Sequence, residues 1–249
     1  MTATGTPRET HEAIEAVWRI EAARLIAGLA RLVNDIGLAE ELAQDALVAA
    51  LEQWPSEGIP RNPGAWLMTT AKRRAIDLIR RQERYSRKLA EIGHEIETRH
   101  EPGPEGQATE ELQDDLLRLI FTACHPVLTT EARVALTLRL VGGLTTAEIA
   151  RAFLVGESTI AQRIVRAKRT IAKAQVPYEV PTGEELATRL SSVLEVIYLI
   201  FNEGYSATAG DDWMRPELCA EALRLGRILA ELMPREPEVH GLVALMEIQ

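Results

Sequence analysis

The chain has 249 residues, of which 46% are hydrophobic, 26% are charged and only 4% are aromatic. This composition favours a soluble, all-α protein of two or more small domains over a sheet protein. The net charge of −9 argues against a nucleic-acid partner unless positive charge is concentrated locally. It is concentrated, because one basic block lies within residues 72–88 and another within residues 163–173.

The first predicted unit, residues 9–87, is a helical bundle. Apolar residues recur at helical spacing through residues 13–32 and again through residues 38–51, which predicts two amphipathic helices packed against each other. The expected buried positions are Ala13, Val17, Ile20, Leu25, Leu29, Leu32, Leu38, Leu42, Leu47 and Leu51.

A proline- and glycine-rich loop, residues 55–64, follows a helix that ends near Trp54. The next helix starts near Ala65 and carries the first basic block. Its apolar period places part of the helix against the bundle and leaves the charged residues on the outer surface. Expected to be buried are Leu67, Ala71, Ile76 and Ile79; expected to be exposed are Lys72, Arg73, Arg74, Asp77, Arg80 and Arg81.

Residues 88–110 are rich in glutamate, proline and glycine and are predicted to be a linker. A second helical domain is expected over residues 111–175. It begins with helices over residues 112–124 and 130–140, whose leucines need a partner surface, and continues into residues 144–173.

Residues 144–173 are the most informative part of the sequence, because they predict two short helices around a tight turn. Thr145 or Thr146 can cap the first helix. The turn holds Leu154 and Val155, where many helix-turn-helix motifs carry a glycine. The first helix is expected to bury Ile149, Ala150 and Phe153.

The second of these helices opens near Glu157 or Ser158, after Gly156. A polar first turn followed by arginines is typical of a recognition helix, whose first turn reads bases while its arginines contact phosphates. The plain alternative is a bundle surface with a solvated basic face. Expected to be buried are Ile160, Ile164 and Ile171; expected to be exposed are Ser158, Thr159, Gln162, Arg163, Arg166 and Arg169.

Residues 182–249 contain three further helical patterns and form an added domain. No thirty-four-residue period is readable in them, so helical repeats are not predicted from spacing. The last helix, residues 239–248, ends without a capping glycine or a polar tail, which is the pattern expected if the chain is truncated within a stack of helix pairs.

Cys124 and Cys219 lie far apart in apolar helical patterns, so reduced, buried thiols are expected rather than a disulfide. His125 follows Cys124 and is predicted to be a helix-end residue, because one Cys and one His cannot make a closed metal site. No metal and no cofactor are expected. The N-terminus lacks an apolar secretory core and no segment is long and apolar enough to span a bilayer, so the protein is expected in the cytoplasm.

An enzyme is the remote alternative. Its candidates are Glu203 with Tyr205 and the pair Asp211 and Asp212. Paired carboxylates in a glycine-flanked loop are more often a helix cap or a solvated turn, and no nucleophile, base or phosphate-binding motif accompanies them. The protein is therefore not expected to be an enzyme.

The order of elements over residues 9–174 resembles the extracytoplasmic-function sigma factors, the compact specificity subunits of bacterial RNA polymerase. In that family a first domain binds core polymerase and opens the minus-ten promoter element, and a helix-turn-helix domain reads the minus-thirty-five element. Residues 196–207, VIYLIFNEGYSA, resemble the subgroup with a C-terminal tetratricopeptide-like helical extension, whose implied role is regulatory. The resemblance implies core polymerase and promoter DNA as partners and no membrane; it leaves an anti-sigma partner unknown.

Residues 38–54 resemble the family's polymerase-binding helix, with an acidic start, a Gln-Asp pair and a terminal tryptophan. The loop at residues 55–65 lies where the family captures a flipped base. The implied polymerase-binding residues are Glu40, Glu41, Gln44, Asp45, Leu47, Leu51 and Trp54.

Residues 65–81 resemble the family's basic helix, with a tryptophan-leucine start and an aspartate before paired arginines. Arg73 departs from the pattern, because many members have asparagine there, so base preference at the minus-ten element can differ. Trp66 is as well suited to anchoring the helix as to stacking on a base. The implied DNA-binding residues are Trp66, Lys72, Arg73, Arg74, Asp77, Arg80 and Arg81 in the first domain, and Thr146, Ser158, Thr159, Gln162, Arg163, Arg166 and Arg169 in the second.

A conventional helix-turn-helix repressor or activator, dimeric on duplex DNA, is the closer alternative. It would share the signal of residues 144–173. A dimeric regulator has no need for a second basic helix behind a Pro/Gly loop, whereas a sigma factor needs one to hold opened DNA. The first basic block therefore favours the sigma factor.

Overall fold

The computed structural model describes residues 7–90, 108–205 and 216–249. Within these ranges every regular element is an α-helix, which confirms the predicted all-α class. Most of the predicted linker, and the pair Asp211 and Asp212, lie outside the described residues. None of the helices in these ranges is both long enough and apolar enough to cross a membrane.

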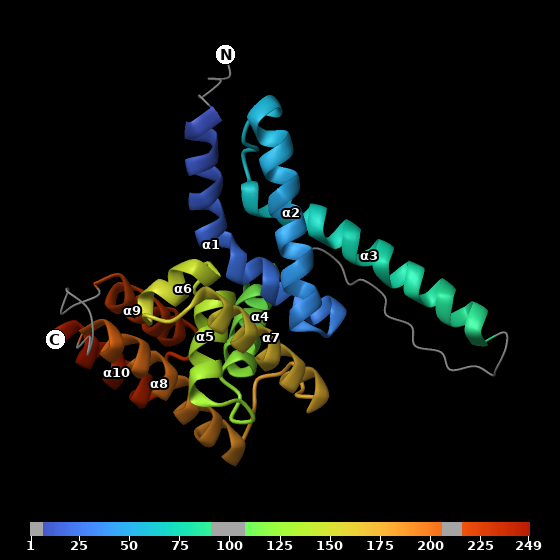
Figure 1. Ribbon diagram of the computed structural model, residues 1–249. Coiled ribbons are helices and arrows are strands. Elements are labelled where there is room, and N and C mark those ends of the chain that lie inside the picture. The colour runs from blue at the N-terminus through green and yellow to red at the C-terminus, as the bar shows by residue number, and fades with distance from the viewer. Residues whose placement is uncertain (1–6, 91–107, 206–215) are drawn as a thin grey trace.

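The first bundle, residues 7–90, is an antiparallel helical pair from which a third helix projects (Figure 1). The carboxylate of Asp35 caps the second helix by accepting hydrogen bonds from two backbone N–H groups of its first turn, at 2.7 and 2.9 Å. The three helices are α1 (Pro7–Val33), α2 (Ile36–Glu57) and α3 (Pro63–Ala90).

Two helix boundaries in the first bundle differ from the predicted ones. α2 continues beyond Trp54 to Glu57 with Pro55 inside it, so the loop before α3 is shorter than predicted. The side chain of Asn62 then accepts a hydrogen bond from the N–H of Ala65 at 3.0 Å and caps α3. At its other end α3 extends to residue 90, into the predicted linker.

The second domain and the added domain follow as seven helices in the described residues. The helix-turn-helix domain, residues 108–173, contains α4 to α7, and the extension, residues 184–249, contains α8 to α10 (Figure 1). The three helical patterns predicted for the extension are therefore confirmed. The helices are α4 (Ala108–Ala123), α5 (Thr130–Leu140), α6 (Thr146–Ala152), α7 (Glu157–Lys173), α8 (Glu184–Tyr205), α9 (Pro216–Leu232) and α10 (Pro237–Ile248).

The helix-turn-helix has the predicted cap and the predicted turn. Thr145 and Glu148 form a capping box at the start of α6, in which each side chain accepts from the other residue's backbone N–H. In the turn, Leu154 adopts a φ of 50°, the left-handed region that glycine occupies without penalty. The N–H of Val155 donates to the carbonyl of Ala150 at 3.0 Å and closes the turn. The geometry common to glycine-containing motifs is thus reached with leucine.

Replacing Thr145 by alanine is expected to lower the free energy of unfolding by about 1 kcal/mol. The change removes the hydroxyl that accepts the N–H of Glu148 at 3.1 Å. Urea denaturation followed by circular dichroism measures the loss, with Thr182→Ala as a control at an exposed position before α8. Equal stability of the two variants would show that the capping box contributes nothing.

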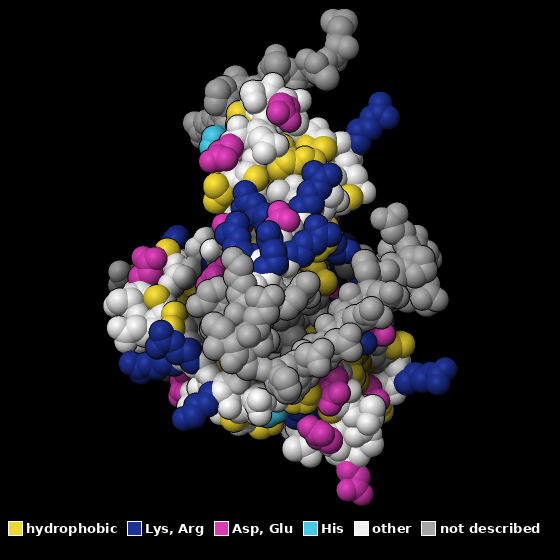
Figure 2. All heavy atoms as spheres, turned by 90° about the vertical axis from the view of Figure 1, so that its right-hand side faces the viewer, with side chains coloured by type: hydrophobic (Ala, Val, Ile, Leu, Met, Phe, Trp, Pro, Cys, Tyr) yellow, Lys and Arg dark blue, Asp and Glu magenta, His cyan; other side chains and the backbone are white. Residues whose placement is uncertain are grey.

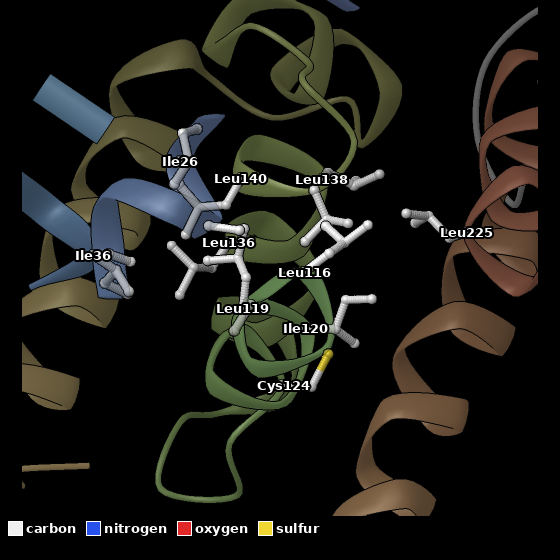
Figure 3. Packing of buried hydrophobic residues seen from close by; sticks show 14 of the residues in the cluster. Ile26, Ile36, Leu116, Leu119, Ile120, Cys124, Leu136, Leu138, Leu140 and Leu225 are labelled. Carbon is white, nitrogen blue, oxygen red and sulfur yellow. The ribbon is translucent and has the colours of Figure 1, made fainter. Parts of the chain in front are cut away.

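A single apolar core runs through all three parts of the chain. Helices α4 and α5 lie at its centre, with α1 and α2 on one side and α9 on the other (Figure 3). Ile26 of α1 lies beside Leu140 of α5, and Leu225 of α9 approaches from the opposite side (Figure 3). Each of these three side chains is at most 3% exposed. The domains recognised in the sequence therefore pack as one body.

Two buried arginines fix the extension to the helix-turn-helix domain. The guanidinium of Arg133 on α5 donates to Ser192 and pairs with Glu195 at 2.9 Å, both on α8. From α8, Arg189 donates to the backbone carbonyl of Phe121 on α4 at 3.1 Å. Because a buried charge is costly unless it is paired and hydrogen-bonded, these contacts oppose separation of α8 from α4 and α5.

Two predicted core positions are wrong. Ile20 is 67% exposed, because the buried stripe of α1 passes through Ala22, about 200° further round the helix. Ile76 is 39% exposed, because the buried stripe of α3 passes through Ala71 and Ala75 at i, i+4 spacing. In both helices alanine occupies the buried position and the large isoleucine side chain is exposed. The small alanine side chain lets neighbouring helices approach closely.

Both cysteines are free thiols. Cys124 is buried, its sulfur lies 3.2 Å from the hydroxyl of Thr137, and burial raises its pKa to about 11. Cys219 is only half-buried, so the expectation of two buried thiols is correct for Cys124 and wrong for Cys219. His125 follows the end of α4, as predicted, and its Nδ1 accepts the N–H of Val127 at 3.0 Å.

Candidate polymerase and nucleic-acid surfaces

The basic helix α3 presents a row of cations on the face of the molecule toward which it projects. Figure 2 shows the cluster of Lys and Arg side chains on this face. Arg74 is partly withdrawn, because it pairs with Asp45 of α2 at 3.2 Å. The side chains of Arg87 and Lys88 lie outside the described residues. Exposed on α3 are Lys72, Arg73, Asp77, Arg80, Arg81 and Arg84.

Trp66 is held in the first bundle by a second tryptophan. Its ring lies 5.3 Å from that of Trp54 in an edge-to-face arrangement, and Trp54 is 2% exposed. Trp66 is half-buried. The pair joins the end of α2 to the start of α3 and so fixes the direction in which the basic helix leaves the bundle.

The N-terminal turn of α7 is open to solvent. Ser158 and Thr159 are exposed there, Gln162 is exposed in the second turn, and the guanidinium of Arg166 donates to the amide oxygen of Gln162 at 3.3 Å. Arg169 is exposed one turn further on. A polar, exposed first turn on a helix of 17 residues has the size and chemistry of an element that enters a major groove.

Arg163 and Thr146 are less accessible than the rest of the predicted set. Arg163 is half-buried and lines a pocket of about 170 Å³ between α5, α6, α7 and α8, together with Glu131 and Glu203. The pKa of Glu131 is lowered, chiefly by its backbone N–H at the start of α5 and then by the Thr129 side chain. The carboxylates beside Arg163 reduce its freedom to reach a phosphate or a base.

The outer face of α2 combines acidic and apolar side chains. Glu41 and Asp45 are exposed, and Gln44, Leu47 and Leu51 are half-buried. Val48 is 50% exposed on the same helix and was absent from the predicted set. The sequence does contain a sign of this position: Val48 is apolar, follows Leu47 directly and lies outside the apolar face that α2 turns toward the bundle.

Glu40 and Trp54, predicted on this same surface, are buried. Trp54 packs against Trp66, and Glu40 is 4% exposed. The Glu40 carboxylate pairs with Arg139 at 2.6 Å and with Lys168, both from the helix-turn-helix domain. Exposed and buried members of the predicted polymerase set therefore lie side by side on α2.

The residues proposed for an enzyme do not come together with a nucleophile or a base in the described part of the chain. Glu203 lines the pocket beside Arg163, and the ring of Tyr205 stacks on Phe201 at 5.9 Å. Nor do any three His, Cys, Asp or Glu side chains among the described residues lie close enough to hold a metal.

Three protein families match separate parts of the chain. Sigma-70 region 2 matches residues 20–85, which cover most of α1, α2 and α3. Sigma-70 region 4 matches residues 118–171, which include the helix-turn-helix. A family of unknown function (DUF6596) matches residues 189–249, within the extension.

Similar proteins match over longer stretches. The chain is 42% identical over 225 residues to an uncharacterized protein of Rhizobium meliloti. This match covers 90% of this chain and 53% of that protein. It is 29% identical over 154 residues to the ECF RNA polymerase sigma factor SigK of Mycobacterium ulcerans, covering 59% of this chain and 76% of SigK. SigK of Mycobacterium tuberculosis matches at the same identity over 149 residues, covering 57% and 74%.

The chain thus spans about half the length of the Rhizobium relative and three quarters of SigK. The region 2 match includes α3 and the region 4 match includes most of α7, and both helices carry exposed basic side chains. The segment beyond them matches a separate family. The chain belongs to the extracytoplasmic-function sigma factors and carries a C-terminal helical extension.

Proposed function

We propose that this protein binds core RNA polymerase and directs it to promoters by reading a minus-ten and a minus-thirty-five element. The observation that carries the proposal is the presence of two separate exposed elements whose side chains suit DNA. One is the basic helix α3, which projects from the first bundle, and the other is the exposed first turn of α7. A protein that only binds duplex DNA needs the second element alone.

Polymerase binding is assigned to the outer face of α2. Glu41 and Asp45 supply negative charge there, and Val48 supplies an exposed apolar side chain between half-buried leucines. An apolar centre with a charged rim is the usual composition of a protein interface. The proposed polymerase set on this face is Glu41, Gln44, Asp45, Leu47, Val48 and Leu51. Glu40 and Trp54 of the same helix are buried, so they can contribute only where their present partners move away.

The minus-ten element is assigned to α3 and the loop before it. Single-stranded DNA is held by a positive surface that follows its backbone and by aromatic rings on which bases stack. α3 supplies the positive surface, whereas Trp66 is half-buried against Trp54 and serves mainly to fix the helix. Melted DNA would therefore be held chiefly by charge, through Lys72, Arg73, Arg74, Arg80 and Arg81. Trp66 and Asp77 complete the proposed set at the start and in the middle of the helix.

The minus-thirty-five element is assigned to the helix-turn-helix. Ser158, Thr159 and Gln162 lie in the exposed first two turns of α7, where base-reading side chains sit in such motifs. Arg166 and Arg169 follow on the exposed side, suited to phosphates. Arg163 and Thr146 complete the proposed set from half-buried positions.

The arginine pair of α3 gives a direct test of the minus-ten assignment. The double variant Arg80→Gln/Arg81→Gln is expected to weaken binding of the polymerase complex to a promoter with a premelted minus-ten segment, evenly across sequences. Two lost contacts to single-stranded DNA lower the slope of log affinity against log salt by about 1.4. A salt titration by fluorescence anisotropy measures this slope.

A matched control removes two arginines far from the proposed surfaces. Arg227 and Arg235 are exposed in the extension, so Arg227→Gln/Arg235→Gln changes the net charge by the same amount. If the control lowers the slope as much as the α3 pair does, the effect reflects net charge, and α3 does not contact DNA.

The competing function, a dimeric regulator on duplex DNA, is separated from a sigma factor by one binding experiment. The purified chain is mixed with promoter duplex alone, with core polymerase alone and with both. A sigma factor comigrates with core polymerase and retains promoter DNA only in the ternary mixture. A regulator shifts the duplex without polymerase and does not bind the core enzyme.

A further inference from the structure

The carboxylate of Glu40 joins the first bundle to the helix-turn-helix domain. Arg139 of α5 donates from Nε to one carboxylate oxygen at 2.6 Å, and the ammonium of Lys168 on α7 pairs with the other. Gln44, one turn along α2, donates to the same oxygen as Arg139 at 2.9 Å. Glu40 is 4% exposed, so its charge is satisfied entirely within the protein.

Other polar contacts join the same two domains. Arg31 of α1 pairs with the buried Asp115 of α4 at 3.1 Å. The hydroxyl of Tyr178, which follows α7, lies 3.0 Å from the carbonyl oxygens of Ala27 on α1 and Asp115 on α4. Apolar contact between α1 and α5, including Ile26, continues this interface (Figure 3). The two domains therefore meet through a specific, largely buried surface.

We propose that this arrangement is a closed state, in which the helix-turn-helix domain occupies Glu40 near the start of α2 and must leave before core polymerase can engage that helix fully. The proposal rests on the proposed function, because Glu40 belongs to the surface assigned to polymerase. The contact that defines the closed state is the triad of Glu40, Arg139 and Lys168.

Mutual exclusion follows from the chemistry of the triad. A buried carboxylate needs cationic partners, and those of Glu40 are already supplied by α5 and α7. A cation of polymerase can reach this carboxylate only where Arg139 and Lys168 have withdrawn. The apparent affinity for polymerase is then the intrinsic affinity multiplied by the fraction of open molecules.

The closed state leaves a second part of α2 accessible. Glu41, Asp45 and Val48 remain exposed, so polymerase has a surface for first contact before the interface opens. Lys168 lies on the helix that carries the base-reading turn, and Glu40 lies on the bundle from which α3 projects. In the closed state the distance between the two proposed DNA surfaces is fixed. Opening therefore also allows this distance to change.

A reversible disulfide across the interface tests the proposal. A Cβ placed on Gly143, in the loop between α5 and α6, lies 3.9 Å from the Cα of Arg19 on α1, within the reach of a disulfide. The variant Arg19→Cys/Gly143→Cys also carries Cys219→Ser, which removes the half-buried native thiol. Binding to core polymerase is measured for the oxidised and the dithiothreitol-reduced forms of the same full-length chain.

The oxidised form is expected to bind core polymerase at least about tenfold more weakly than the reduced form. Because both forms have the same sequence, any strain from replacing Gly143, whose φ is 70°, affects both forms alike. Equal binding by both forms would overturn the proposal, since the closed arrangement would then be competent. Failure of the two cysteines to join under oxidation, judged by mass spectrometry, would overturn it as well.

A charge reversal opens the interface without touching α2. Lys168→Glu places a second carboxylate against Glu40 and is expected to raise the affinity for core polymerase about tenfold and to increase the radius of gyration in small-angle scattering. Lys173→Glu is the matched control, with the same charge change at an exposed position of the same helix. Unchanged affinity and size for Lys168→Glu, or equal changes in both variants, would contradict the proposal.

The two measurements separate failure of this inference from failure of the proposed function. If the chain opens in scattering but no form binds core polymerase, the proposed function is wrong and the inference about polymerase is lost with it. If all forms bind polymerase equally, the function stands and the closed state has no inhibitory role.

Discussion

Replacing Phe121 by alanine is expected to lower the free energy of unfolding by about 3–5 kcal/mol. Phe121 is 0% exposed and lies on α4, the helix that packs against α1, α5, α8 and α9. Its backbone carbonyl also accepts a hydrogen bond from the buried guanidinium of Arg189. Urea denaturation measures the loss, with Phe121→Leu as the conservative comparison, for which about 1 kcal/mol is expected.

The same variant tests whether the extension is an integral part of the core. Because α8 is fixed to α4 and α5 by Arg133 and Arg189, hydrogen exchange should accelerate in α5 and α8 together. Faster exchange in α5 with unchanged protection of α8 would contradict this account. The extension would then be a separate module and not a structural support of the helix-turn-helix.

Replacing Gln162 by alanine is expected to change promoter preference at one base pair of the minus-thirty-five element by about 1–3 kcal/mol. The Gln162 side chain is exposed in the second turn of α7, and Arg166 donates to its amide oxygen at 3.3 Å. Competition between promoter duplexes that differ at single positions, read out with the polymerase complex, gives the preference at each base pair.

Arg169→Gln is the comparison for Gln162→Ala, because Arg169 is exposed on the same helix and is assigned to phosphate. It should weaken binding to all duplexes by a similar factor. The division of labour along α7 is wrong if Gln162→Ala lowers affinity uniformly, or if Arg169→Gln alters the preference for particular bases.

Local patterns in the sequence predicted the elements of the site well. The sequence predicts a cap at Thr145 or Thr146, a start of α7 near Glu157 or Ser158 and the burial of Ile160 and Ile164, all from residues within one or two helical turns. The structure has the cap at Thr145, completed by Glu148 into a capping box, and the start at Glu157. The exposed first turn of α7 follows from the same helical period. These predictions are confirmed because nearby residues determine caps and helix faces.

Features that depend on distant contacts could not be predicted. The sequence predicts Glu40 on an open surface, yet it is buried by Arg139 and Lys168, which lie 99 and 128 residues further along the chain. Which apolar face a helix buries also depends on its partners, and for this reason the predicted burial of Ile20 and Ile76 is wrong. A single sequence offers no pattern that joins such positions.

The turn of the helix-turn-helix is an intermediate case. The sequence located it at Leu154 and Val155, but leucine gives no sign of the left-handed backbone that Leu154 adopts. The closing hydrogen bond from Val155 to Ala150 and the burial of Ile149 hold this conformation. Here the packing of neighbouring residues overrides a local preference.

Run-off transcription with bacterial core polymerase on a mixed promoter library tests the central claim most directly, because only a sigma factor supplies promoter-specific initiation to the core enzyme. The reaction is run with and without this chain. New start sites are expected that appear only with the chain and that share two sequence elements upstream. An unchanged transcript pattern, together with binding of promoter duplex in the absence of polymerase, would contradict it and support a dimeric regulator.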